Sequence, residues 1–284
     1  MNQIIAVNTL AYHGYELAEV FENISKSGAK YVEPVFIKTY YHELTEESFS
    51  LSNAKEIKNL INNAGLTVHA IAAHMDLGLE NSSEMFLRRM DFGKEIGASI
   101  INTNATVKQN EKVFYTNIEK ISKYAEDIDI YVGLENPGAG ENNIFGNGEE
   151  GVELIKRIGS ERIKINYDFA NAYMYSKAMI KPEDDFKEAL PYTIHFHLKD
   201  VVKYKDGFYL TKIGAGIINY EAIFGELKNL DINIPMSIEL PLRFKWDLKY
   251  NFISDKLNAP LPITQINSII SDSLEYINRM LIKS

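Results

Sequence analysis

Eight short runs rich in β-branched and aromatic residues recur along the chain, separated by longer stretches whose apolar residues follow helical spacing. Several of these stretches end one residue before a glycine, as at Gly28, Gly65, Gly97 and Gly159, the position after a helix where φ turns positive. Strands that alternate with helices form a parallel sheet covered by helices. The eight runs are 4–10, 30–36, 66–74, 98–104, 130–136, 162–168, 193–200 and 235–240.

The repetition of eight strand–helix units in 284 residues, with no change of composition and no linker, predicts one α/β domain over residues 1–284. It favours a single closed (β/α)8 TIM barrel over a doubly wound sheet. After the first run the chain reads NTLAYHGY, which lacks the glycine-rich phosphate loop of nucleotide-binding sheets. The long insertion 241–262 precedes a final helix expected from about Thr264 to Leu281, and we expect it to form a lid over the barrel mouth or an oligomer contact.

The amino-acid composition limits which metal ligands and which binding partners the protein can have. The chain contains no cysteine, so any metal must be held by His, Asp, Glu, Asn or backbone oxygen. Its net charge of −9 argues against a nucleic acid or an anionic membrane as partner. There is no apolar run of the ~20 residues that a membrane span needs, and no basic and apolar leader at the N-terminus. We therefore expect a cytoplasmic protein with no nucleic-acid or membrane partner.

Acids and a histidine follow four consecutive predicted strands. The fifth to eighth runs end in or near Glu135, Asp168, His197 and Glu239, and the catalytic groups of a barrel of this type lie at the C-terminal ends of its strands. Neighbouring strands are about 4.8 Å apart, so these side chains can reach one ion near the barrel axis. Without a cation, the crowded carboxylates would repel one another and raise each other's pKa. The set suits Mn²⁺, Mg²⁺, Co²⁺ or Zn²⁺.

The segment IHFHLKD carries two of the six histidines. Residues two apart on a strand point to the same side, so His195 and His197 share a face. We expect that face to be the barrel interior, because the alternating Ile194, Phe196 and Leu198 would pack under the helices. His197 then lies nearer the catalytic end as a metal ligand, and His195 lies one layer below as a filler or a supporting partner.

Five segments that occur in order and at barrel spacing resemble the xylose isomerase-like TIM barrels, also called sugar phosphate isomerases/epimerases. The resemblance covers nearly the whole chain. It is more specific for this superfamily than for any one substrate. The segments are LEN (134–136), INYDFAN (165–171), HLKD (197–200), KIGAGIINY (212–220) and SIEL (237–240).

The resemblance implies one divalent metal ion, manganese first among the candidates, on Glu135, Asp168, His197 and Glu239. In the ketose 3-epimerases of this family the two glutamates also act as acid and base, which assigns these roles to Glu135 and Glu239. The resemblance also implies substrate contacts at Glu141 and at the position of Lys203, where the family has an arginine. Lysine keeps the charge of that arginine but loses its bidentate fork.

Two further positions are candidate substrate contacts. Where many relatives read Asp-x-x-His, this chain has Asn171, which can hydrogen-bond a hydroxyl but cannot carry a proton. His74, at the end of the third run, is either a substrate contact or a packing histidine.

These residues predict a metal-dependent isomerase or epimerase that moves a proton through an enediolate on a ketose or related polyol. We expect a small-molecule sugar or polyol substrate and a homo-oligomer. One alternative is a metal-dependent lyase or dehydratase, or a C-glycoside deglycosidase subunit, on the same barrel. Another is a non-catalytic binding subunit. A DNA repair nuclease of the endonuclease IV type is disfavoured, because its three-metal cluster needs more histidines than the six present.

Overall fold

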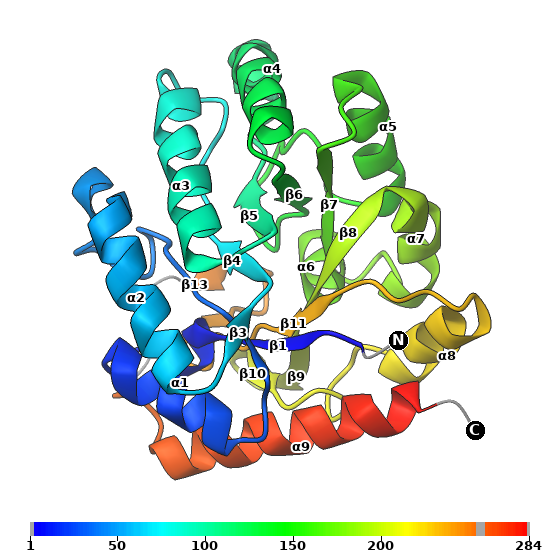
Figure 1. The fold of residues 1–284 in the computed structure, drawn as a ribbon. Coiled ribbons are helices and arrows are strands. Elements are labelled where there is room, and N and C mark those ends of the chain that lie inside the picture. Colours follow the sequence, from blue (N-terminus) through cyan, green and yellow to red (C-terminus); the bar gives the residue numbers. More distant parts are fainter. Residues whose placement is uncertain (1–2, 254–258, 283–284) are drawn as a thin grey trace.

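The computed structural model describes residues 3–253 and 259–282. In Figure 1, parallel strands form a ring at the centre, and helices α1–α5, α7 and α8 are arranged around it. Each of the eight predicted runs contains a strand of this ring, so the predicted (β/α)8 barrel is confirmed. The strands are β1 (Ile5–Asn8), β2 (Tyr31–Glu33), β3 (Thr67–Val68), β4 (Ala70–Ala72), β5 (Ile100–Asn104), β6 (Tyr131–Glu135), β7 (Ile163–Asp168), β8 (Thr193–Leu198) and β11 (Met236–Ile238).

The third barrel strand is divided into β3 and β4. β3 pairs with β2, and β4 pairs with β5, so each half of the third strand pairs with a different neighbouring strand. The ring closes across this break through two backbone hydrogen bonds, from Phe36 N–H to Ala72 O (2.8 Å) and from Ala72 N–H to Pro34 O (3.0 Å). The break therefore leaves the barrel without an open edge.

The helices occupy the stretches between the runs, with two of them, α6 and α7, between β7 and β8. Glycines at positive φ follow α3 (Gly97, φ 111°) and α5 (Gly159, φ 71°), as the sequence predicts. The α-helices are α1 (Leu17–Lys26), α2 (Leu51–Asn63), α3 (Ser82–Ile96), α4 (Glu111–Asp127), α5 (Gly148–Ile158), α6 (Phe169–Tyr175), α7 (Pro182–Ala189), α8 (Tyr220–Asn229) and α9 (Ile263–Leu281). Short 3-10 turns are η1 (Thr9–Tyr12), η2 (Glu46–Phe49), η3 (Lys108–Asn110) and η4 (Leu190–Tyr192).

Side chains of the barrel strands divide between an apolar outer layer and a polar interior. On β8, Phe196 packs against Phe169 and Phe186 on the helix side, with ring centroids 5.2 and 6.4 Å away. His195 and His197 are buried and interact with side chains of other barrel strands. The predicted direction of the two histidines is therefore correct, and the barrel interior holds the polar groups from which the site is built.

A second, antiparallel sheet lies beside the barrel mouth. Its order is β13-β12-β10-β9, and it joins the hairpin after β8 to the insertion 241–262. Residues 254–258 of that insertion lie outside the described residues. Whether the segment acts as a lid or as an oligomer contact stays a prediction. The strands are β9 (Asp200–Tyr204), β10 (Gly207–Thr211), β12 (Lys245–Trp246) and β13 (Phe252–Ile253).

Within residues 3–253 and 259–282, none of the helices has the length and apolar character needed to cross a bilayer.

Candidate active site

The four predicted metal ligands lie together at the C-terminal end of the barrel. Glu135 ends β6, Asp168 ends β7, His197 lies on β8 and Glu239 directly follows β11. Asp168 and His197 are partners in the parallel register of β7 and β8. One ligand atom from each of the four residues lies within 4.8 Å of the others, and all four side chains are buried. The strands are parallel neighbours in the ring, so their C-terminal ends meet at the same end of the barrel.

Three buried carboxylate oxygens of this cluster, Glu135 Oε2, Asp168 Oδ2 and Glu239 Oε2, are held by ion pairs, with His74 Nε2 or Lys199 Nζ 2.8–2.9 Å away. Carboxylates buried this close together need positive charge beside them, and a metal ion supplies it as the lysine does. His197 Nδ1 faces the same point, 2.7 Å from Glu239 Oε2 and 3.2 Å from Glu135 Oε2. Three oxygens and one imidazole nitrogen that converge in this way fit a divalent cation.

Lys199 is also a member of the cluster, although it was not predicted from the sequence. Its Nζ lies 2.8 Å from Asp168 Oδ2, 2.8 Å from Glu239 Oε2 and 3.4 Å from Glu135 Oε1. Burial disfavours a charged ammonium, but these three carboxylates outweigh it and raise the pKa of Lys199 well above its usual value. The signal was present in HLKD, because Lys199 lies two residues after His197 and therefore faces the same side.

The protein shifts the pKa values of the cluster in opposite directions. Burial raises the pKa of Asp168 to about 6, with the charges of Glu135 and Glu239 adding to the effect and Lys199 opposing it. Burial acts in the same direction on Glu135, but His197, Lys199 and His74 lower its pKa well below the usual value. Such divergence among neighbouring carboxylates is typical of sites that move protons.

Glu33, at the end of β2, holds the far side of the His197 ring. Its two carboxylate oxygens lie 3.1 and 3.0 Å from His197 Nε2, and they also accept hydrogen bonds from Asn102 Nδ2 (2.7 Å) and Asn8 Nδ2 (2.9 Å). Because an ionised carboxylate only accepts, Nε2 carries the hydrogen, and Nδ1 is the nitrogen that faces the cluster. Glu33 was not predicted from the sequence, although an acid in the apolar run KYVEPVF was a usable signal.

His195 lies one layer below. Its Nδ1 is 3.1 Å from both Asn102 Nδ2 and Asn166 Oδ1, and its Nε2 is 3.1 Å from Ser237 Oγ. Burial lowers the pKa of His195 to about 3, so the ring is neutral near pH 7. Both ring nitrogens have partners, which agrees with a supporting position under His197.

His74 and Asn171 both contact Glu135. His74 Nε2 lies 2.9 Å from Glu135 Oε2, and Asn171 Nδ2 donates to Glu135 Oε1 at 2.8 Å. The backbone N–H of Asn171 also donates to Asp168 Oδ1 (2.7 Å), because Asp168 caps α6. A Cβ at Gly138 would collide with the Asn171 amide, which explains the glycine there. Asn171 thus orients two acids of the cluster, in addition to its predicted place at the substrate.

Asp200, the last residue of HLKD, anchors the KIGAGIINY loop behind the site. Its carboxylate accepts the backbone N–H groups of Gly214 (3.0 Å), Gly216 (2.9 Å) and Ile218 (3.1 Å). An added Cβ at Gly216 would collide with the same carboxylate. Tyr220 Oη donates to Lys199 O at 2.7 Å, so the loop also fixes the backbone that carries the lysine.

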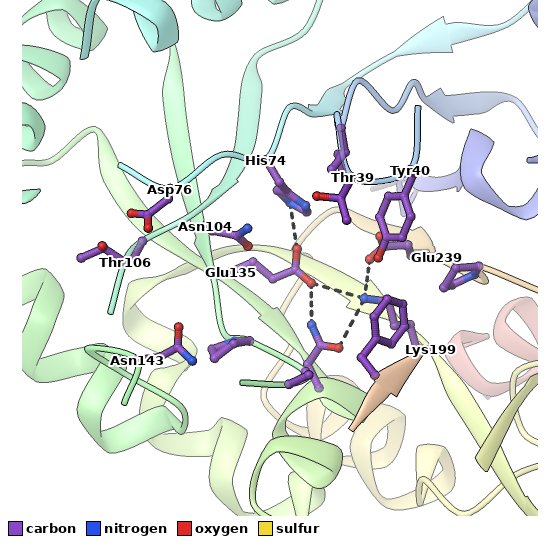
Figure 2. Close-up of a pocket in the computed structure, with 18 of the residues that line it drawn as sticks. Thr39, Tyr40, His74, Asp76, Asn104, Thr106, Glu135, Asn143, Lys199 and Glu239 are labelled. Atoms are coloured by element: carbon purple, nitrogen blue, oxygen red, sulfur yellow. Dashed lines mark hydrogen bonds and ion pairs between the residues drawn. The ribbon is translucent and has the colours of Figure 1, made fainter. Parts of the chain in front are cut away.

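A cavity of about 310 Å³ extends from the cluster toward the barrel mouth (Figure 2). His74, Asn171 and Lys199 line it, together with Glu135 and Glu239. The other lining residues are Ile37, Thr39, Tyr40, Asp76, Asn104, Ala105, Thr106, Val107, Pro137, Gly138, Ala139, Asn143, Phe145, Pro241, Trp246 and Phe252. Its size is that of a small-molecule site.

Two expected substrate contacts are not among the lining residues. Glu141 is exposed in the loop after β6. Lys203 is exposed on β9, with its Nζ 5.5 Å from the centre of the Phe208 ring. Lys203 is displaced because β9 belongs to the outer hairpin rather than to the barrel. The structure therefore does not bring these two residues to the cluster.

Comparison with known proteins assigns the family. Residues 21–254 match the family model described as xylose isomerase-like TIM barrel, and the chain belongs to this family. An uncharacterized protein of Methanocaldococcus jannaschii (MJ1311) is 24% identical over 247 residues, which cover 82% of this chain and 78% of that protein.

Solved structures with this fold cover nearly the whole chain. A xylose isomerase-like TIM barrel protein from Mycobacterium smegmatis, in complex with magnesium, superposes with a TM-score of 0.69 at 18% identity, covering 99% of this chain and 97% of that one. A D-psicose 3-epimerase in the presence of D-fructose gives 0.73 at 15% identity, with 98% and 99% covered. A probable 3-DHS dehydratase, AsbF, from Bacillus anthracis gives 0.68 at 15% identity, with 98% and 99% covered. At these identities the likeness shows the shared fold.

Proposed function

We propose that the protein is a divalent-metal-dependent isomerase or epimerase of a ketose or related polyol. The observation that carries the proposal is the pair Glu135 and Glu239. They come from strands that are separated in the ring by β7 and β8, yet each directs a carboxylate oxygen at the same point, within 4.8 Å of ligand atoms of Asp168 and His197. Because the two carboxylates approach one point from different strands, one can take a proton from one side of a substrate and the other can return a proton from a different side.

In the proposed mechanism, Glu135, Asp168, His197 and Glu239 hold the ion. A divalent ion bound there would polarise a carbonyl and a neighbouring hydroxyl of the substrate. One glutamate takes the proton from the carbon beside the carbonyl, and the substrate becomes an enediolate. The other glutamate returns a proton, to the opposite face for epimerisation or to the neighbouring carbon for isomerisation. Lys199 lies where its ammonium supports the negative charge that develops on the substrate oxygen.

The test measures both the metal and the proton transfer. We expect about one Mn²⁺, Mg²⁺, Co²⁺ or Zn²⁺ per chain by elemental analysis, with manganese first, and loss of the metal in Asp168→Ala. Incubation of the loaded protein with ketoses in D₂O should place deuterium beside the carbonyl. Glu239→Gln should retain substrate binding but exchange at least ~10²-fold more slowly, the scale of a lost general acid or base. Exchange at the wild-type rate in Glu239→Gln would exclude its assigned role.

A second candidate is a metal-dependent lyase or dehydratase. The dehydratase AsbF covers 98% of this chain in the structural comparison, and a dehydration of this kind begins with the same proton abstraction. The product distinguishes the two, because a dehydratase gives an unsaturated product and water, whereas an epimerase gives an isomer of the same mass. Lack of metal binding even after supplementation would instead favour a non-catalytic binding subunit.

The homo-oligomeric state and the cytoplasmic location remain part of the proposal. Light scattering on the purified protein tests the former, and cell fractionation tests the latter.

A further inference from the structure

We propose that the cavity contains a polyol subsite, formed by Asp76, Asn104, Thr106 and Asn143, that selects an uncharged polyhydroxylated substrate and rejects its phosphorylated form. This inference rests on the proposed function, because it names the class of substrate that the same cavity takes. It concerns the end of the substrate that lies away from the reacting carbons.

The subsite begins directly beside the acid cluster. Asn104 is the last residue of β5, and it is the register partner of Glu135 on β6. Asp76 lies in the loop after β4, Thr106 lies two residues after the end of β5, and Asn143 lies in the loop after β6. Figure 2 shows these four residues on one side of Glu135, with Lys199 and Glu239 on the other. A substrate held at the cluster can therefore extend toward them.

Backbone hydrogen bonds tie the three loops of the subsite together. Leu77 N–H donates to Ala105 O (2.9 Å), which joins the loop after β4 to the loop after β5. Val107 and Asn143 form an antiparallel bridge, and Ile144 N–H donates to Thr106 O (3.0 Å). The subsite is thus already ordered, so a ligand does not have to order these loops as it binds.

The side chains of the subsite have unused hydrogen-bonding capacity. The amides of Asn104 and Asn143 line the cavity without a hydrogen bond to another described side chain or backbone group. Thr106 lines the cavity, and its Oγ1, which is itself closed to solvent, has no partner among the described residues. Amides and hydroxyls both donate and accept, as sugar hydroxyls do, so the two sets match.

The charge of the cavity disfavours an anion at this end. Asp76 presents a carboxylate, one oxygen of which accepts the Gly78 N–H (2.8 Å). Of the described residues that line the cavity, the one lysine or arginine is Lys199, which lies among three carboxylates. A phosphate beside Asp76 would lose its water without gaining a cation.

Aromatic residues also line the cavity. They include Tyr40, Trp246 and Phe252, and Trp246 Nε1 donates to Gly138 O (2.8 Å), which fixes the indole. A monosaccharide has hydroxyl edges and a C–H face, and a cavity lined by both polar and aromatic side chains suits both. The volume of about 310 Å³ is at the lower end for small-molecule sites and favours a single sugar unit over an oligosaccharide.

The experiment compares probes that reach different parts of the cavity of the Co²⁺-loaded protein. Hydroxyacetone offers the carbonyl and hydroxyl that the cluster would bind. D-fructose, D-tagatose, D-allulose and L-ribulose add the hydroxyl tail, and D-fructose 6-phosphate adds a terminal charge. Titrations followed by the Co²⁺ absorption spectrum give the affinities. We expect the wild type to bind at least one free ketose more tightly than hydroxyacetone, and D-fructose 6-phosphate at least tenfold more weakly than D-fructose.

Variants of the subsite residues test whether the subsite causes the difference in affinity between the ketoses and hydroxyacetone. Asn104→Ala and Asn143→Ala should each weaken binding of the preferred ketose roughly three- to tenfold, the scale of one lost hydrogen bond, and change hydroxyacetone binding less than twofold. Asn62→Ala, on the exposed face of α2, is the matched control and should change neither. Asp76→Asn keeps an oxygen for the Gly78 N–H and should narrow the gap between D-fructose and its phosphate.

The outcomes separate the subsite from the proposed function. Equal or tighter binding of the phosphate, no gain of any ketose over hydroxyacetone, or equal losses of both probes in Asn104→Ala and Asn143→Ala would overturn the subsite while leaving the metal site intact. Failure of Co²⁺ or hydroxyacetone to bind the wild type would overturn both.

Discussion

His195 and His197 lie two residues apart on one strand and face the same interior, yet their surroundings are opposite in character. Around His195, both ring nitrogens have neutral partners in Asn102, Asn166 and Ser237. Around His197 the groups are charged: its ring nitrogens face Glu33 and Glu239, and Lys199 pairs with the nearby Asp168. A barrel interior can therefore hold a lower layer of neutral groups around His195 and, directly above it, an upper layer of charged groups around His197. Glu33 connects the two layers, since it contacts both His197 and Asn102.

The largest expected effect comes from removing the ammonium group of Lys199 from the upper layer. Lys199→Met should lower the free energy of unfolding of the metal-free protein by about 3–5 kcal/mol, because it removes the buried ammonium that pairs with Asp168, Glu135 and Glu239. Excess Mn²⁺ should restore most of this loss, since a cation that binds the folded state stabilises it.

Lys203→Met is the matched control for this variant, because Lys203 is exposed on the neighbouring strand β9. It should change the free energy of unfolding by less than about 0.5 kcal/mol. Denaturant unfolding with and without chelator gives both values. If Lys199→Met is as stable as the wild type without metal, the lysine does not neutralise the cluster.

An intermediate effect is expected at Glu33, which connects the upper and lower layers. Glu33→Gln keeps the size of the side chain but removes the charge that orients His197 Nε2. We expect the dissociation constant for Mn²⁺ or Co²⁺ to rise about 10- to 100-fold, as when other carboxylate partners of metal-bound histidines are lost. Isothermal titration with the metal alone measures this without reference to a substrate. An unchanged metal affinity would show that the His197 ring is held in place without Glu33.

The smallest effect is expected in the lower layer, and it depends on pH. Burial lowers the pKa of His195 to about 3, below the unfolded value of about 6.5. The unfolded chain therefore binds a proton at this position between these pH values while the folded chain does not. The contribution of His195 to stability is complete above pH 6.5 and is lost as pH falls.

Replacement of His195 by glutamine should remove this dependence. Between pH 7 and pH 5 the chelator-treated wild type should lose about 2 kcal/mol more of its free energy of unfolding than His195→Gln, from ~1.4 kcal/mol per pH unit over the titrating range. Denaturant unfolding at the two pH values tests this. The same loss in both proteins would mean that His195 is not kept neutral by the fold.

The sequence predicts the barrel and the upper layer well, for a simple reason. Strand–helix alternation determines a parallel ring, and the ring places Glu135, Asp168, His197 and Glu239 at one end whatever the details of packing. The lower layer was harder to predict. Glu33 and Asn102 come from strands far from His197 in the chain, and the hydrogen bonds that join them depend on the barrel's closure and on side-chain rotamers.

Other details of the site depend on departures from the repeating pattern. The hairpin β9–β10 leaves the barrel after Asp200 and carries Lys203 away from the cavity. Glu141 is exposed for a related reason, because the loop that holds it turns through two positive φ values, at Gly140 (87°) and Asn142 (59°). Neither the hairpin nor the loop can be predicted from the periodicity of strands or helices. The number of residues that separates Lys203 or Glu141 from a metal ligand therefore did not predict where its side chain lies.

The Asp200 carboxylate has a consequence for how this fold can vary. It holds the start of the β9–β10 hairpin and the returning Gly214–Ile218 loop together at one base, where Asp200 also pairs with Thr211. The base of the hairpin is thus fixed by Asp200, and β10 is held in addition by β12, where Phe208 pairs with Trp246 of the cavity. The turn at Lys205 belongs to neither attachment. Changes of sequence or length at this turn therefore offer a way to vary the rim of the barrel while Lys199 and Trp246 keep their places.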